Sequence, residues 1–540
     1  MAIRVFRCNL KASRFPLLTH YFGRSVASRG PDDTDYVVTD SYTGTAANDE
    51  IGIPMPIYMH NVVPVSHGLQ SVGYVTNLDY ANAEETDFDQ AIVLRASNEN
   101  THLLVPASGR NYINYNGTTW NPQYPNTIIK YGGPVTKAYV QQRTFVCYRR
   151  NGVFEYNSVT NVLDPIVLNG ITDTELDGIC YSNNFLIAYT SDTVFWSSVT
   201  DPTDFIPNLS NGANSSKLVF ARGAIVSVLP IHNGYVIYTT HNAISAYWSG
   251  NLNAPWVFRE IPGSAGITNP EHVSHDSNYD KHFAWTTSGL MQISKEGAIL
   301  TFPEITDFLT CGYMEDYIGD VNPTGQGTKE FVPWWLAAEK QLKFTSKVDN
   351  LMCWKYQGQL RIKVAFVGSR YVAVSYGVAG QLTHILVFDL ALRRWGKLRI
   401  NHVDVFEYTM PGEQLNFNVK HSFGILQANG TIQTVDFTHE ARATDAVILY
   451  GRVQHQRAAQ SILYSTEVDG VLKEDLRLTW LPTYDGATLL PDYHPMPVIK
   501  NSNTVKYSGR FTARSFVIKI LGSFSLSNLQ FNLESAGGNR

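Results

Sequence analysis

The chain repeats one short unit, which consists of a strand of apolar and aromatic residues, a tight turn and a second such strand. Two copies are closely similar: residues 145–160 read FVCYRRNGVFEYNSVT and residues 185–200 read FLIAYTSDTVFWSSVT. Weaker copies begin at five other positions, namely Leu103, Tyr235, Phe283, Tyr371 and Phe423. Most copies begin roughly 40 to 50 residues after the previous one, which is the period of β-propeller blades. The repeat therefore predicts an all-β chain whose main domain is a β-propeller of about six to eight blades.

One step of the repeat is longer than the others, because 88 residues separate the copies that begin at Phe283 and Tyr371. The sequence from 303 to 350 differs from the rest: it contains a turn-rich segment, VNPTGQGTKE, and a helix-like segment, VPWWLAAEKQLKF. Two normal periods would also fill this step. We favour an insertion of residues 303–350, with propeller sequence before it (61–302) and after it (351–444).

The turns between the paired strands support hairpins. Asn151-Gly152 and Asn429-Gly430 lie between apolar strands, where a two-residue turn needs positive φ. No Trp-Asp and Gly-His pair marks the units, so the sequence does not support the WD40 class. Repeated hairpins alone do not force radial closure, and a β-sandwich or a string of hairpins is the alternative.

The last hundred residues predict a second β domain at 445–540. Apolar residues recur there with a period of two, slip near Asn528, and then resume. They are Phe516, Ile518, Ile520, Phe524, Leu526, Leu529, Phe531 and Leu533. With Gly522 in the middle, this pattern predicts a terminal hairpin with one buried face and one irregularity.

Charged residues make up only 16% of the chain, whereas 44% of the residues are hydrophobic. The chain can therefore bury large cores, and much of its surface is expected to be uncharged or covered by other subunits. The formal net charge of -5 gives no global argument for nucleic-acid binding.

The first 31 residues are an exception, because they contain basic residues and no Asp or Glu. Such an arm can contact nucleic acid or an acidic partner subunit, although a solvated terminus is an equally good interpretation. We treat residues 1–60 as an N-terminal arm. Its candidate partner-contact residues are Arg4, Arg7, Lys11 and Arg14.

The cysteines are five in number and far apart, at Cys8, Cys147, Cys180, Cys311 and Cys353. Without a C-x-x-C pair, they predict buried free thiols in a reducing compartment, not a disulfide framework or a zinc site. No apolar run approaches the roughly 18 residues that a membrane span needs, and the N-terminus is a poor signal peptide. We therefore expect no membrane span and no cofactor.

The densest polar cluster is HVSHDSNYDKH, residues 272–282. Imidazole and carboxylate groups can bind metals, but this spacing matches no standard site. On a strand, His272 and His275 would lie on opposite faces, and Asp276 to Tyr279 resembles a turn. A solvated loop is the better interpretation, and we predict no metal site.

Carboxylates that could serve a glycosidase occur at Asp87 and Asp89 and at Asp173, Glu175 and Asp177. A glycosidase needs two carboxylates held about 5 to 10 Å apart across the sugar, which sequence alone cannot establish. Nucleophile-elbow and P-loop signatures are missing from the sequence. The sequence therefore predicts no catalytic residues, and a structural or binding protein more than an enzyme.

Several longer segments resemble a known family. They are VFWSSVTDPTDFIPN, GANSSKLVFARGAIVSVLPIHNGYVIYTTHNAIS, FREIPGSAGITNP, HFAWTTSGLMQIS, FPEITDFL, the C-terminal GRFTARSFVIKILGSFSLSNLQFNLESAGG and the N-terminal SRFPLLTHYFGRSV. Together they resemble the tail nozzle, or hub, proteins of short-tailed bacteriophages, some of which are known as packaged-DNA stabilisation or tail tubular proteins. The resemblance covers most of the chain from about residue 145 onward.

This resemblance implies a structural protein of the virion tail, assembled in the host bacterial cytoplasm. Six copies would form a homo-hexameric ring below the portal and the head-to-tail adaptor protein, with propellers outside and β domains lining a channel. The ring would close the DNA channel after packaging and conduct double-stranded DNA at ejection without sequence-specific binding. Tailspikes or fibres would attach to its flank. The resemblance carries over no active-site residues and does not say which residues line the channel.

A mildly acidic protein suits such a channel, because each neutralised phosphate adds affinity and friction. The basic arm is therefore expected to dock on the adaptor, and replacing Arg4, Arg7, Lys11 and Arg14 with Ser is expected to weaken tail assembly. The alternatives are a phage-associated propeller glycosidase and a carbohydrate-binding adhesin. Release of reducing sugar would identify the first, and glycan binding by the isolated chain the second.

Overall fold

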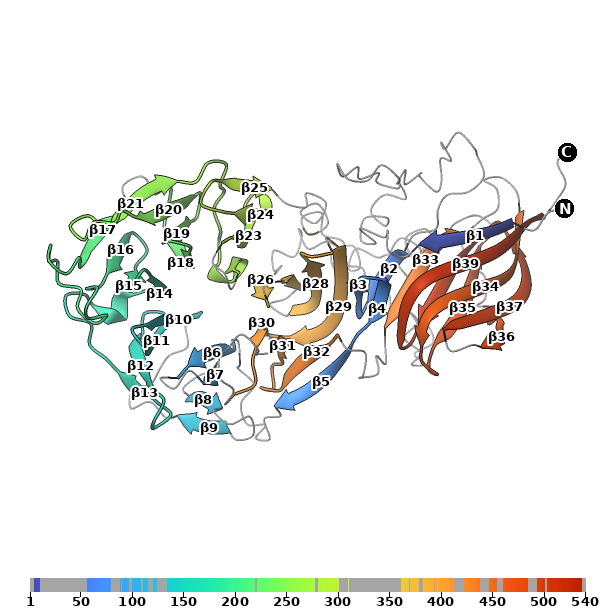
Figure 1. The fold of residues 1–540 in the computed structure, drawn as a ribbon, viewed down its shortest axis with the longest axis horizontal. Coiled ribbons are helices and arrows are strands. Elements are labelled where there is room, and N and C mark those ends of the chain that lie inside the picture. Colours follow the sequence, from blue (N-terminus) through green and yellow to red (C-terminus); the bar gives the residue numbers. More distant parts are fainter. Residues whose placement is uncertain are drawn as a thin grey trace, which may run out of the picture.

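A computed structural model gives the fold of the chain. It describes residues 4–9, 56–78, 88, 90–96, 100–107, 110–114, 120–123, 134–218, 221–276, 280–300, 309, 361–368, 370–377, 382–392, 394–411, 422–437, 446–453, 460–483, 493–500 and 503–536. These residues form strands almost throughout, together with two short 3-10 turns, η2 (Asp173–Glu175) and η3 (Pro270–His272). The chain is an all-β protein in which a β-propeller adjoins a second β domain (Figure 1).

Seven four-stranded blades make up the propeller within the described residues. Blade 1 is β6 (Ile92–Arg95), β7 (Thr101–Ala107), β8 (Arg110–Asn114) and β9 (Trp120–Gln123). Blade 2 is β10 (Val135–Val140), β11 (Arg143–Tyr148), β12 (Gly152–Asn157) and β13 (Val162–Pro165). Blade 3 is β14 (Gly178–Ser182), β15 (Phe185–Tyr189), β16 (Thr193–Trp196) and β17 (Asn214–Lys217).

Blades 4 and 5 are β18 (Ile225–Ile231), β19 (Gly234–Thr239), β20 (Ala243–Trp248) and β21 (Trp256–Glu260); and β22 (Val273–His275), β23 (His282–Thr286), β24 (Gly289–Ile293) and β25 (Ala298–Leu300). Blade 6 is β26 (Arg361–Val367), β27 (Tyr371–Gly377), β28 (Leu382–Asp389) and β29 (Arg394–His402). Blade 7 is β30 (Asp404–Tyr408), β31 (Ser422–Leu426), β32 (Ile432–Asp436) and β5 (Gly73–Leu78).

The blades close into a ring. The first strand of each blade contacts the first strands of its two neighbours, and β30 of blade 7 contacts β6 of blade 1. An apolar cluster fills each of the seven spaces between neighbouring blades. Blade 7 takes its outer strand, β5, from the N-terminal side of the propeller, so the two ends of the propeller sequence meet in one sheet. Radial closure excludes the alternatives of a string of hairpins and a simple sandwich for this part of the chain.

Every repeat that the sequence shows is the middle pair of strands of one blade, from β7 and β8 to β31 and β32. The turn at Asn151-Gly152 differs from the prediction. Tyr148 pairs with Gly152, so three residues form the turn, and Arg150 has a φ of 55°. The long step between Phe283 and Tyr371 separates blades 5 and 6, which are neighbours in the ring. The expected insertion, 303–350, lies outside the described residues except for Leu309.

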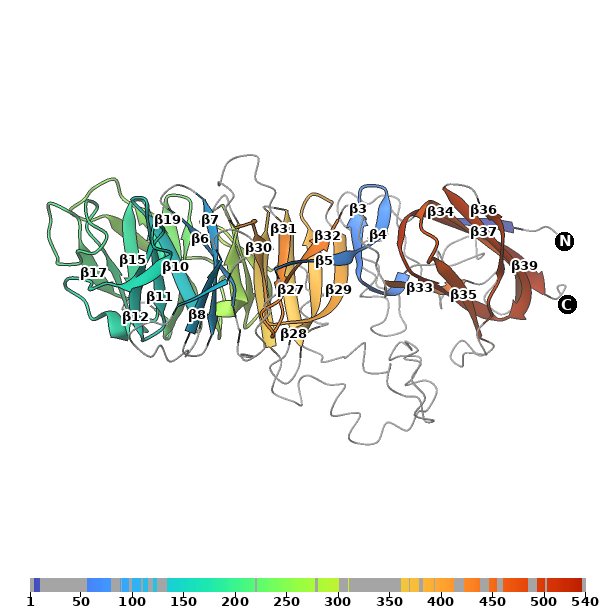
Figure 2. The same ribbon diagram turned by 90° about the horizontal axis from the view of Figure 1, so that it is seen from below.

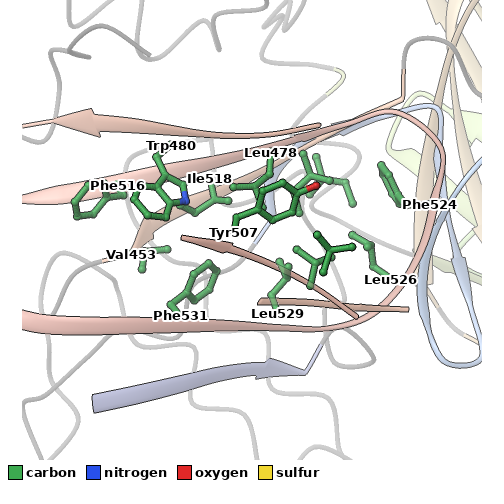
Figure 3. Packing of buried hydrophobic residues seen from close by; sticks show 14 of the residues in the cluster. Val453, Leu478, Trp480, Tyr507, Phe516, Ile518, Phe524, Leu526, Leu529 and Phe531 are labelled. Carbon is green, nitrogen blue, oxygen red and sulfur yellow. The ribbon is translucent and has the colours of Figure 1, made fainter. Parts of the chain in front are cut away.

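The second domain is a β-sandwich. One sheet contains β36 (Met496–Lys500), β37 (Thr504–Ala513), β34 (Gln460–Leu472), β39 (Phe524–Ala536) and β1 (Arg4–Asn9). The other contains β2 (Pro56–His60), β33 (Val447–Val453), β38 (Ser515–Leu521) and β35 (Arg477–Thr483). Figure 3 shows the apolar core between them, where Trp480 and Phe531 are fully buried. Residues 1–60, expected to be an arm, thus contribute two strands to this domain.

The predicted terminal hairpin is wrong in its pairing. Its alternating apolar residues are buried as expected, and the slip near Asn528 is a shift of register against Gly470 of β34. However, β38 pairs with β33 and β35, whereas β39 pairs with β34, β1 and β4. The chain crosses from one sheet to the facing sheet at Gly522, which has a φ of 111°. A chain that crosses between facing sheets buries alternate residues just as a hairpin within one sheet does. The alternation of apolar residues therefore could not distinguish a crossing from a hairpin.

A hairpin of β3 (Val62–Val65) and β4 (Gly68–Ser71) joins the two domains. In β3, Val62 pairs with Lys397 of β29, and in β4, Leu69 pairs with Leu526 of β39. Blade 6, this linking hairpin and one sheet of the sandwich therefore form a single 11-stranded sheet. Figure 2 shows the hairpin between the propeller and the sandwich. These residues belong to the connection between the domains, whereas the sequence predicted propeller from residue 61 onward.

Gly68 is expected to tolerate no side chain. An added Cβ would lie 1.9 Å from the backbone oxygen of Leu526, a clash that only a shift of the backbone can relieve. Gly68→Ala is therefore expected to separate β4 from β39, at a cost of about 1–3 kcal/mol. In calorimetry, the propeller and sandwich should then unfold in two transitions in place of one.

The matched control is Gly297→Ala, whose nearest neighbour would be the Pro262 oxygen at 3.7 Å. This control should unfold as the parent protein does. An unchanged single transition in Gly68→Ala would contradict the role assigned to the linking hairpin.

Candidate functional site

The strongest concentration of buried charge in the described residues lies where the innermost strands of the propeller begin. Glu271 is in η3, immediately before the first strand of blade 5. Arg361 and Lys363 are in the first strand of blade 6, and Asp404 begins the first strand of blade 7. Because these strands are neighbours in the ring, closure of the propeller brings the four side chains together.

The four side chains form one connected network. Arg361 donates to both carboxylate oxygens of Glu271, at 2.8 Å from Nη2 to Oε1 and 3.3 Å from Nε to Oε2. The Nζ atom of Lys363 lies 3.6 Å from Oε1 of Glu271 and 2.6 Å from Oδ1 of Asp404. The backbone N–H of Ala91 donates to Oδ2 of Asp404 at 2.7 Å. The network therefore ties blades 5, 6 and 7 to the segment that enters blade 1.

Burial and the neighbouring charges act in opposite directions on these groups. Burial favours the neutral form of Glu271, but the charges of Lys363 and Arg361 outweigh it and lower the pKa of this carboxyl. Burial likewise opposes the charge on Lys363, yet Asp404 and Glu271 raise the pKa of its amine. For Asp404, burial dominates and raises the pKa despite Lys363. A charged Lys363 is thus held between two carboxylates inside the protein.

Neutral histidines surround this network. Burial lowers the pKa of His272 to about 4 and that of His402 to about 3. His402 contacts the Ile400 oxygen through Nδ1 at 2.7 Å and the Ser375 hydroxyl through Nε2 at 3.0 Å. A buried imidazole with two polar contacts and a strongly lowered pKa stays uncharged at neutral pH, and its role here is structural.

A second polar group lies on the first strands of blades 2, 5 and 7. Lys137 is exposed on β10, but the protein around it disfavours its charge and lowers its pKa to about 8, with Glu407 acting in the opposite sense. Burial lowers the pKa of His275, and the charge of Lys137 adds to this effect. Lys137 donates to the Val93 oxygen of blade 1.

The chemistry available to the buried network is limited. Both oxygens of Glu271 accept from Arg361, Oδ2 of Asp404 accepts from the Ala91 N–H, and Oδ1 of Asp404 lies 2.6 Å from the Nζ atom of Lys363. Such carboxylates join neighbouring blades and are poorly placed to accept a proton from a substrate. Within the described residues, no group of His, Cys, Asp and Glu has the arrangement of a metal site.

The polar cluster at 272–282 divides between several places. The prediction of a solvated loop is wrong here, because His272 lies in η3, His275 lies in β22, and Asp276 and His282 are buried. Asp276 accepts from the backbone N–H groups of Asp280 and Lys281 and so closes a turn. His282 is fully buried and contacts the Tyr238 hydroxyl at 2.7 Å and the Pro230 oxygen at 2.9 Å. Each of these contacts holds strands or turns together.

The other candidate carboxylates also have structural roles or lie outside the described residues. Asp177 is buried and accepts from Arg149 at 2.9 Å and Arg150 at 3.0 Å, which ties blade 2 to the start of blade 3. Asp173 and Glu175 lie in η2. Asp87 and Asp89 lie outside the described residues.

Two of the four candidate partner-contact residues lie in the described part of the chain. Arg4 and Arg7 lie in β1, where Arg4 pairs with Leu533 and Arg7 with Gln530 of β39. Lys11 and Arg14 lie outside the described residues.

Of the cysteines, Cys147 and Cys180 are buried free thiols, and burial raises the pKa of the Cys147 thiol to about 12. No helix in the described part is long and apolar enough to cross a membrane.

Comparisons with known proteins add only to the description of the fold. No family model and no curated protein matches the chain. Among solved structures, it is similar to the WD40 β-propeller domain of Doa1, with a TM-score of 0.38 and 7% identity over 68% of this chain and 97% of that one. It is also similar to YCF48 bound to D1 peptide, with a TM-score of 0.38 and 9% identity over 67% of this chain and 94% of that one. The propeller assignment rests on the strand topology above.

Proposed function

We propose that the chain is a structural subunit of a bacteriophage tail nozzle, which closes the DNA channel after packaging and conducts DNA at ejection. The resemblance of its sequence to nozzle proteins is the first support. The second is its architecture, a propeller beside a β-sandwich, which agrees with what that resemblance implies. In the ring, six sandwiches would surround the channel and six propellers would lie outside.

The observation that carries this proposal is the firm connection between the two domains. Besides the shared sheet, the hydroxyl of Ser71 donates to the Phe524 oxygen at 3.0 Å and accepts from the Phe524 N–H at 2.8 Å. His67 contacts the Ser525 hydroxyl at 2.7 Å. Such a connection suits a ring subunit that must hold its outer and inner parts in place.

A buried asparagine strengthens the same connection. Asn61 has a φ of 51° and lies between a sandwich strand and the linking hairpin. Its Oδ1 atom accepts from the hydroxyl of Tyr74 at 2.7 Å and from the backbone N–H of Arg399 at 2.9 Å. One side chain therefore joins blade 7, blade 6 and the connection to the sandwich. Contacts of this kind fix the propeller relative to the connection and suit a subunit with a fixed arrangement of its domains.

The proposed partners are further copies of the chain, a head-to-tail adaptor, tailspikes or fibres, and packaged double-stranded DNA. Lys11 and Arg14 are the proposed adaptor contacts, together with Arg4 and Arg7 at the edge of the sandwich. The proposed location is the virion tail. The carboxylates of Asp177, Glu271 and Asp404 are engaged in ion pairs between blades, which favours this structural role over the glycosidase alternative.

Copy number in the virion tests the proposal. Quantitative mass spectrometry of purified particles, with the major capsid protein as the internal standard, should find about six copies of this chain per particle, as expected for one closed ring. In a separate assay, the isolated chain should release no reducing sugar from host surface polysaccharide.

Absence of the chain from the particle would overturn the nozzle proposal. A count in multiples of three well above six would indicate a spike or fibre, and sugar release that depends on the chain would support the glycosidase.

A further inference from the structure

The first described strand, β1, is held in an unusual way. Among the described strands it is the outermost of its sheet and pairs only with β39, antiparallel, from Arg4 opposite Leu533 to Asn9 opposite Asn528. Along the same strand, β4 pairs with Ser525 and Leu526. Six residues of β39 would therefore present an unpaired backbone edge if β1 were elsewhere.

That edge belongs to a part of the core that is completely buried. Leu529, Phe531 and Leu533 of β39 are each 0% exposed and lie in the apolar core of the sandwich. An uncovered strand edge beside such residues is a template for pairing with another chain. The sandwich thus requires a strand at this edge, but the pairing depends only on the sequence of that strand. A β1 from any copy of the protein satisfies it.

The connection from β1 to the rest of the chain is far longer than its own sandwich needs. β1 ends at Asn9 in one sheet, and β2 begins at Pro56 in the facing sheet. Facing sheets lie only about 10 Å apart, and most connections in compact domains use about 4–6 residues. The intervening 46 residues can span up to about 150 Å when extended. This length allows β1 to reach a neighbouring copy.

We propose that in the assembled protein β1 of each copy pairs with β39 of the neighbouring copy. The inference rests on the proposed function in one respect, that the chain forms a homo-oligomer. Each copy donates one strand to the next copy and accepts one from the previous copy, a head-to-tail arrangement that forms a ring when the rotation between copies closes. The exchanged strand keeps all the pairs that it makes within one copy, so exchange costs few contacts and gives each interface a strand of backbone hydrogen bonds.

Cysteine pairs in the register of β1 and β39 test this exchange. Arg7 pairs with Gln530, so Arg7→Cys and Gln530→Cys place two thiols on adjacent strands. The two single variants, each with a different affinity tag and with Cys8→Ser, are co-expressed in equal amounts, oxidised and separated under denaturing, non-reducing conditions. If β1 is exchanged, about a quarter of the interfaces should contain a donor and an acceptor of the right kind and yield a disulfide-linked dimer that carries both tags.

The control pairs Arg7→Cys with Lys506→Cys, because Lys506 lies on β37, which does not adjoin β1. It should give no mixed dimer. The Arg7→Cys/Gln530→Cys double variant should give a ladder of linked oligomers. A second pair, Val5→Cys with Asn532→Cys, lies two positions outward in the register and guards against a variant that fails to fold.

The outcomes separate this inference from the proposed function. Mixed dimers from either register pair support strand exchange. If the protein is oligomeric but both double variants are linked only within single chains, strand exchange is overturned and the ring remains. Monomers linked within single chains overturn the exchange and also contradict the ring. Failure of both pairs to form any disulfide overturns the β1 assignment itself.

Discussion

Replacing Lys363 with methionine should destabilise the propeller by about 3–5 kcal/mol, because it breaks a buried ion pair by removing one partner. Lys363 is only 9% exposed, and its Nζ atom is 2.6 Å from Asp404, which is itself 2% exposed. Without the amine, Asp404 keeps only the Ala91 N–H as a partner among the contacts described above, and Glu271 keeps Arg361. Urea unfolding followed by tryptophan fluorescence should show a lower midpoint with little change in slope.

Two further variants make this result interpretable. Lys295→Met removes an exposed lysine that lies 3.8 Å from Glu296, and it should change the stability by less than about 0.5 kcal/mol. The double variant Lys363→Met/Asp404→Leu removes both charges of the buried pair and should recover part of the loss, since an apolar replacement leaves no unpaired charge. If Lys363→Met behaves like Lys295→Met, the network does not tie the blades together.

The propeller itself could be predicted because its blades share one local pattern. In β11, Phe145 and Cys147 pack toward blade 3, whereas Val146 and Tyr148 pack toward blade 1. A strand buried on both faces reads as a continuous apolar run, and seven such runs, most of them roughly 40 to 50 residues apart, are visible without any knowledge of contacts. The runs predicted the blades, but radial closure was established only by the contacts between the first strands of neighbouring blades.

The charge network could not be predicted, because it depends on closure of the ring. Glu271, Lys363 and Asp404 are far apart in sequence and meet only when three first strands lie side by side. A local signal did exist, since a lysine interrupts the apolar strand RIKVAFV and an aspartate begins DVFEY. A charge inside a buried strand indicates a buried partner but does not identify it.

The linking hairpin and the strands from the N-terminus were missed for a related reason. β1, β2, β3 and β4 pair with strands that lie hundreds of residues away, and short strands carry little pattern of their own. Gly396 shows why the join is specific: a Cβ there would lie 2.8 Å from the Val62 oxygen and from the Val63 Cα atom. The close approach of two backbones is invisible in the sequence until the partner is known.

Acid should unfold the protein well above the pH at which its exposed carboxylates are protonated. Burial lowers the pKa of His272 to about 4 and the pKa values of His282 and His402 to about 3, whereas these groups titrate near 6.5 in an unfolded chain. Below pH 6.5 the unfolded state therefore binds protons that the folded state does not, and the free energy of unfolding falls as the pH falls. The contribution of these three histidines is fully present well above pH 6.5 and is lost progressively as the pH falls toward about 4 for His272 and about 3 for His282 and His402.

The size of this effect follows from the three shifts. At pH 5 each histidine contributes a loss of roughly 2 kcal/mol, so the free energy of unfolding should fall by up to about 6 kcal/mol between pH 7 and pH 5. The lowered pKa of Glu271 adds to the loss at still lower pH, and the raised pKa of Asp404 opposes it. Urea midpoints measured at half-unit steps of pH, at constant ionic strength, should trace this decline.

A variant of His282 assigns the decline to buried imidazole. His282→Gln keeps a donor and an acceptor for Tyr238 and Pro230 but has no group that titrates in this range. It should be less stable than the parent at pH 7 and lose about 2 kcal/mol less between pH 7 and pH 5. The matched change at exposed His241, His241→Gln, should leave the dependence of the free energy of unfolding on pH as it is in the parent.

A parent protein whose stability does not change between pH 6.5 and pH 5 would show that these histidines are not held neutral. Because His272 and His402 lie beside the Glu271–Lys363–Asp404 network and His282 lies between blades 4 and 5, such a result would also count against the tight packing of blades on which the proposed ring depends.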